Sequence, residues 1–330
     1  MAVSTSVTVA NWLLTEVMSQ IALDPLRGKY VLLPFLNMAD ISGRSSKVRK
    51  IRKKSAISAA VDDTEATAFS NPQTIGVVAN ISITPSTKVQ GIQLTADAIE
   101  LALPGVARSQ VIDAIQGNGA GALPLVRDAM TEILESHYLR AETDALSLFS
   151  GLSESAGTTN QPLTFATLLD AMTKLLDNNP SSEDLVFVLE EIGVGDLRTL
   201  ASSGSGAALS SVFTGNGAAD LSFFNQRPDV SRNGFRGGFC GIPIYAANKN
   251  AMATANSAVD RVAALIVAGR GETGAPGSVR GFAEMTERYE PSLGFQYDLA
   301  DDSLLAVGRW CWAVAEHTDE HGVKIIYEKT

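Results

Sequence analysis

The longest regular pattern in the sequence runs from residue 122 to residue 149. Apolar side chains and one histidine recur there at intervals of three and four residues, the spacing of one face of an α-helix. They are Leu123, Val126, Ala129, Met130, Ile133, Leu134, His137, Ala141, Ala145, Leu148 and Phe149. Pro124 suits the first turn and Gly151 the end. A helix of this length is a rod of roughly 40 Å, so we expect it to be the spine of its domain.

Residues 44–54 concentrate positive charge. They hold 7 of the 26 lysine and arginine side chains and no acidic one, which leaves 19 basic against 36 acidic residues elsewhere. β-Branched Val48, Ile51 and Ile57 interrupt the charges and favour a strand. Three interpretations stay open: contact with nucleic acid, a solvated strand edge, or a strand that pairs electrostatically with an acidic neighbour.

The basic segment is followed by a return strand. Residues 58–73 are small and polar and read as a loop tip that ends at Asn71-Pro72. Apolar side chains alternate in residues 74–95, which is strand periodicity. The whole of 44–95 therefore predicts a two-stranded ribbon. Because such a ribbon is only marginally stable alone in water, we expect it to lie on another surface, that of another subunit.

The other segments predict a mixed α+β chain without an internal repeat. We expect helices at 8–22, 97–116, 163–178 and near 195–200, and an extended piece at 30–36. We expect strands at 183–189, 237–245, 262–268, 278–287, 304–315 and 323–328.

Composition limits the class of protein. The net charge of −10 and the pI of about 4.9 argue against a general nucleic-acid binder, but they suit a container whose wall must not stick to enclosed DNA. Cys240 and Cys311 have no CxxC neighbour, so we expect two buried free thiols in a reducing cytoplasm. No secretory signal and no run of about 18 uncharged apolar residues is found, so we expect synthesis in the cytoplasm and no membrane partner.

Catalytic and ligand-binding strings are missing from the sequence. It contains neither G-x-S-x-G nor the phosphate-binding G-x-x-x-x-G-K-[ST]. His317 and His321 flank a turn and not a helix, which disfavours a metal site, and His137 sits on the apolar stripe of the spine as a core or interface residue. We predict no catalytic residue, no cofactor, no metal and no enzyme activity.

The order and spacing of five segments are informative together. The segments are the ribbon at 44–95, the spine end Arg-Ala-Glu-Thr-Asp at 140–144, the helix and strand at 163–189, Gly-Phe-Cys-Gly-Ile-Pro-Ile-Tyr at 238–245, and the aromatic strand at 304–314. Over roughly residues 30–330 they resemble the major capsid proteins of tailed double-stranded DNA bacteriophages, with the Hong Kong 97-type capsid fold. In that family the ribbon is called the E-loop.

The resemblance implies four parts. They are an N-terminal arm (1–43), the E-loop β-ribbon (44–96), a P-domain with the spine helix at about 122–150 (97–158 and 279–330), and an A-domain (159–278). A long N-terminal scaffolding segment is not expected, because only about 43 residues precede the E-loop. The tip at 58–73 has no lysine, so we expect the shell to be stabilised without covalent cross-links.

The resemblance also implies a function. We expect a structural protein that self-assembles as pentamers and hexamers into an icosahedral phage head around double-stranded DNA, which it encloses without sequence-specific binding. Expected partners are other copies of the chain, a portal protein, and scaffolding, decoration or cement proteins. The expected location is the virion, after synthesis in the host cytoplasm. The alternatives are an encapsulin-like nanocompartment shell protein and a cytoplasmic enzyme.

The ribbon holds the residues that we expect at the contact between subunits. Basic side chains at its base would meet a neighbour's acidic residues and help to select the register of the contact. The predicted set is Arg44, Lys47, Arg49, Lys50, Arg52, Lys53, Lys54, Asp62, Asp63 and Glu65.

Overall fold

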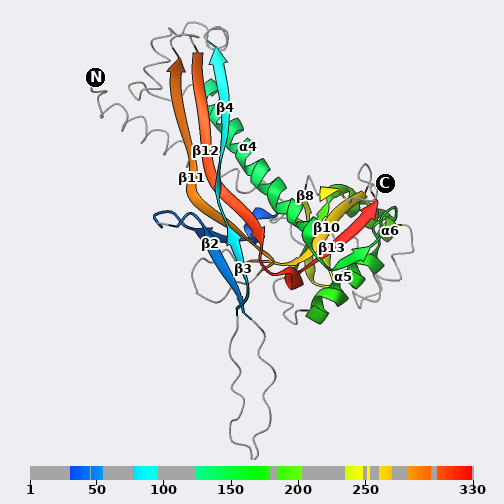
Figure 1. Cartoon of the computed structure of the whole chain (residues 1–330). Helices are drawn as coiled ribbons and strands as arrows, with labels where there is room; N and C mark the ends of the chain where they lie inside the picture. The colour runs from blue at the N-terminus through cyan, green and yellow to red at the C-terminus, as the bar shows by residue number, and fades with distance from the viewer. Residues whose placement is uncertain are drawn as a thin grey trace, which may run out of the picture.

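The spine helix is the central element of the structure, a computed structural model (Figure 1). The structure describes residues 30–44, 46–54, 77–95, 124–178, 185–202, 235–247, 251–252, 260–269, 281–298 and 303–328. Helix α4 (Pro124–Ser147) and the 3-10 turn η2 (Leu148–Gly151) confirm the predicted spine. The segments predicted as helices at 8–22 and 97–116 and as the loop tip at 58–73 lie outside the described residues.

A four-stranded sheet runs beside the spine in the order β1-β11-β12-β4. Its strands are β1 (Asn37–Asp40), β11 (Ala283–Asp298), β12 (Ser303–Glu316) and β4 (Ser86–Thr95). The face toward α4 carries Trp310 and Trp312, whose rings are buried, and the Trp310 ring lies 4.9 Å from that of Tyr138. These aromatic contacts make β12, which the sequence predicts as a strand at 304–315, one of the anchors of the core.

A seven-stranded sheet forms the second body, on the right of Figure 1. Its strands are β5 (Ser155–Gly157), β13 (Gly322–Glu328), β10 (Asp260–Val267), β6 (Leu185–Glu190), β8 (Ile242–Ala247), β7 (Phe235–Phe239) and the short β9 (Ala251–Met252). It is accompanied by α5 (Phe165–Asn178) and α6 (Glu191–Ser202). Every residue of β10 is buried, because separate apolar clusters cover the two faces of this sheet.

The ribbon is the third sheet, made of β2 (Arg49–Lys54) and antiparallel β3 (Val77–Ile83). In Figure 1 it leaves the lower end of the four-stranded sheet. The predicted return strand of 74–95 is not one strand. It divides at Thr84-Pro85, and β4 pairs with β12 instead of β2. Proline has no N–H to donate, which suits a break between two sheets.

Three more predictions differ from the structure. Residues 30–36 are not extended: Leu33–Phe35 form the 3-10 turn η1, in which Pro34 occupies the first turn that its fixed φ allows. The single strand predicted at 237–245 is a hairpin, because Cys240 and Gly241 both have positive φ, as a tight two-residue turn needs. Cys240 is consequently only partly buried, whereas Cys311 is buried, and both thiols are free.

The strands that follow residue 278 also differ from the prediction in their bounds and in the sheet that they join. Strand β11 continues to Asp298 through two register shifts around Tyr289. Strand β13 pairs with β10, so the segment 279–330 that we expected beside the spine contributes its last strand to the seven-stranded sheet. The 3-10 turn η5 (Asp319–His321) precedes β13. No helix among the described residues is long and apolar enough to span a membrane.

Candidate inter-subunit surface

The predicted contact residues fall into three groups in the structure. Arg44, Lys47 and Lys50 are exposed at the base of the ribbon. Arg52, Lys53 and Lys54 are in β2, but their side chains are not among those described, and Asp62, Asp63 and Glu65 lie outside the described residues. Arg49 forms the third group, and it has a partner within its own chain.

Arg49 of β2 binds Glu284 of β11 with two nitrogens. Its Nε donates to Oε1 and its Nη2 to Oε2, at 3.1 Å for the second bond. The Thr286 hydroxyl donates to the same Oε1 at 3.1 Å. Glu284 is 2% exposed, and the Arg49 side chain is 28% exposed. The acidic partner of Arg49 in the structure is therefore on a strand of the same molecule, 235 residues away in the sequence.

The chain before the ribbon is attached to the spine by Glu142. The Glu142 carboxylate accepts three successive backbone N–H groups: those of Val31 and Leu32 on Oε1, at 3.0 and 2.8 Å, and that of Leu33 on Oε2, at 3.1 Å. The residues around it are buried, and this burial raises the pKa of Glu142, an effect that the three N–H groups partly offset. Glu142 lies in the quoted Arg-Ala-Glu-Thr-Asp string, but no role could be assigned to it from the sequence.

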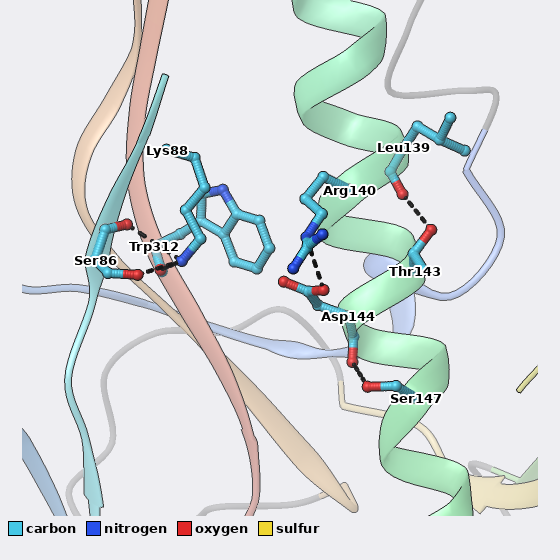
Figure 2. A network of polar contacts seen from close by, with 8 residues as sticks. All are labelled: Ser86, Lys88, Leu139, Arg140, Thr143, Asp144, Ser147 and Trp312. Atoms are coloured by element: carbon cyan, nitrogen blue, oxygen red, sulfur yellow. Dashed lines mark hydrogen bonds and ion pairs between the residues drawn. The ribbon is translucent and has the colours of Figure 1, made fainter. Parts of the chain in front are cut away.

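Lys88 of edge strand β4 lies on the side of the sheet that faces the spine (Figure 2). The Lys88 Nζ lies 4.4 Å from the centre of the Trp312 ring and donates to the Trp312 carbonyl oxygen at 2.9 Å. Figure 2 shows Arg140 and Asp144 of α4 facing this pair, joined by their own ion pair of 3.0 Å. Burial lowers the pKa of Lys88, and the charge of Asp144 acts in the opposite direction. This contact holds edge strand β4 against β12 beside the spine.

His137 is a core residue, as one of the two predicted alternatives had it. It is 3% exposed on α4, with its ring 6.5 Å from that of Trp310 on β12. Burial lowers the pKa of His137, because the charged imidazolium would lose its hydration there.

The depressed pKa of His137 predicts a loss of stability in acid. Above about pH 6.5 the imidazole is neutral in both states, and as the pH falls further the unfolded chain takes up the proton first. We therefore expect His137→Gln to flatten the fall in thermal midpoint between about pH 6.5 and pH 5, measured by circular dichroism. His321→Gln, which removes a partly exposed histidine, is measured alongside it as a control for the loss of an imidazole. A slope unchanged in His137→Gln would contradict the assignment.

The other two histidines hold turns together. Asn37 Nδ2 and His317 Nε2 lie 3.2 Å apart, and His321 Nδ1 lies 3.0 Å from the Gly281 carbonyl oxygen. In the part of the chain that the structure describes, no group of three or more histidine, cysteine, aspartate or glutamate side chains is arranged to hold a metal ion.

By sequence the chain matches no protein-family profile and no curated protein. By structure it is similar to the capsid of Helicobacter pylori bacteriophage KHP30, with a TM-score of 0.58, 9% identity and 91% of each chain covered. The capsid of cyanophage P-SCSP1u has a TM-score of 0.55 at 11% identity, covering 92% of this chain and 90% of that one. A virus-like particle from Pyrococcus furiosus has a TM-score of 0.50 at 10% identity, covering 94% and 98%. The chain therefore has the α+β, Hong Kong 97-like capsid fold that these shell proteins share.

Proposed function

We propose that the chain is a structural major capsid protein, which self-assembles as pentamers and hexamers into an icosahedral phage head enclosing double-stranded DNA. The observation that carries this proposal is the likeness to phage capsids over nine tenths of both chains. The proposal assigns the chain no catalytic role and places it in the virion.

The physical basis of assembly would be the repetition of modest contacts. The exposed basic residues at the ribbon base, Arg44, Lys47 and Lys50, are available to a neighbouring subunit. Each exposed ion pair contributes only about 0–1 kcal/mol. Multivalency stabilises a closed shell, because a subunit that is held by several neighbours leaves only when all of its contacts break together. In a phage head we expect a portal protein, and scaffolding, decoration or cement proteins, to add to these contacts.

Electron microscopy of the purified protein tests the proposal. The full chain would be produced in a bacterial host, purified at low and moderate salt, and imaged by negative stain. Closed shells, or rings of five or six subunits, are the expected result. Uniform particles of monomer or dimer size at all protein concentrations would contradict it.

The likeness to the Pyrococcus furiosus virus-like particle supports a second candidate, an encapsulin-like nanocompartment shell. The contents of shells from the native source separate the two. Nuclease-protected double-stranded DNA is expected for a phage head, and a co-purifying enzyme for a nanocompartment. Portal and terminase genes beside the coding sequence would likewise favour the phage head.

A further inference from the structure

The first residue pair of the ribbon, which we call its first rung, is attached to the rest of the subunit through both strands. Arg49 of β2 pairs with Ile83 of β3 across the ribbon. Ile83 is 2% exposed, whereas Lys50, the next residue of β2, is exposed. One strand is therefore fixed at its base by apolar burial and the other by the ion pair with Glu284. Both attachments occur on the same rung.

The partner of Arg49 is itself immobile. Glu284 lies in β11 between β1 and β12, opposite Asn37 on one side and Ala315 on the other. A buried carboxylate without a cation is strongly unfavourable, so Arg49 is favoured at this position over solvent. A guanidinium that binds both carboxylate oxygens also defines an orientation, which a single ammonium contact does not.

We propose that Arg49, Glu284 and Ile83 form a base clamp, which sets the direction in which the ribbon leaves the subunit. Arg49 is then a positioning residue for the contact between subunits and not itself a member of that contact. The inference rests on the proposed capsid function. A ribbon whose direction is already fixed loses less conformational entropy when it binds a neighbouring subunit. The clamp therefore promotes assembly without contacting that subunit itself.

A pair of matched variants separates the clamp from the general positive charge of the ribbon. The clamp variant combines Arg49→Gln with Glu284→Gln, which removes the ion pair without leaving a buried charge unpaired. The control is Lys50→Gln, which removes one positive charge at the adjacent exposed position. Each full-length protein would be tested for shell yield by sedimentation and microscopy. Backbone hydrogen exchange would be measured on unassembled subunits at residues 49–51 and 81–83, and at 260–267 and 322–328 for comparison.

We expect the clamp variant to form about tenfold fewer closed shells and to exchange about tenfold faster at the ribbon base, at an unchanged thermal midpoint. Exchange in β10 and β13 should not change. In Lys50→Gln, exchange at the ribbon base should stay within about twofold of the wild type, because Lys50 is a candidate for the contact with a neighbouring subunit and not part of the clamp. Wild-type shell yield in the clamp variant, equally fast exchange at the ribbon base in Lys50→Gln, or faster exchange in β10 and β13 as well would each overturn the clamp. If the wild type forms no shells, the capsid function fails instead, while the exchange measurement still decides whether the clamp exists.

Discussion

Replacing Glu142 with alanine is expected to lower the free energy of unfolding by about 3–5 kcal/mol. The change leaves the N–H groups of Val31, Leu32 and Leu33 without their acceptor, in a region where Leu32 is fully buried. Each buried donor left without a partner costs about 1–3 kcal/mol, and water that enters the space recovers part of this. Urea unfolding of unassembled protein, followed by tryptophan fluorescence, measures the change, because Trp310 and Trp312 report on the same core.

Two comparisons make the Glu142 experiment specific. Glu132→Ala removes an exposed glutamate from the same helix and should change stability by less than about 0.5 kcal/mol. The second comparison uses pH. Because burial raises the pKa of Glu142, the folded protein holds this proton more tightly than the unfolded chain, so its stability falls as pH rises through that pKa. The alanine variant should lack this part of the slope. A loss as small as that of Glu132→Ala would contradict the role given to the carboxylate.

Local patterns predicted the regular elements well. The spine needed only the spacing of its apolar residues and the proline and glycine at its ends, and the structure places α4 within the predicted range. The aromatic strand at 304–315 is likewise β12. Errors arose where a break depends on one residue. Pro85 divides a continuous strand pattern between two sheets. Cys240 takes a positive φ, which could not be predicted from a cysteine.

The candidate contact residues show what periodicity cannot predict. One of the three interpretations of the basic segment gave it an acidic partner, but many acidic residues qualified. The choice of Glu284 for Arg49 depends on how β11 lies beside the ribbon base, a contact between residues 235 positions apart. In the same way, Glu142 reads as an ordinary helix residue until the turn at Leu33–Phe35 brings three N–H groups to it. Long-range packing, not local propensity, decides both roles.

Gly308 of β12 is a position where the sheet approaches the spine closely. A Cβ atom there would overlap the Cγ2 methyl of Ile133 and stand 3.1 Å from His137 Nε2. Ile133 is fully buried, so neither partner can move aside without shifting α4 from the sheet. We expect Gly308→Ala to destabilise the protein by about 2–3 kcal/mol, the upper part of the range of about 1–3 kcal/mol that is usual for an overpacked core. Urea unfolding of the unassembled subunit gives the value.

Gly294→Ala is the matched control for Gly308→Ala. Gly294 lies on the neighbouring strand β11, opposite Val307, is exposed, and a Cβ there would meet nothing nearer than a carbonyl oxygen at 3.9 Å. It should be neutral or slightly stabilising, because alanine restricts the unfolded chain more than glycine does. A double variant, Gly308→Ala with Ile133→Ala, should be less destabilised than the two single changes added together, since the new methyl partly fills the space that Ile133 leaves. Additive losses, or equal effects of the two glycine substitutions, would show that close approach of spine and sheet is not what requires Gly308.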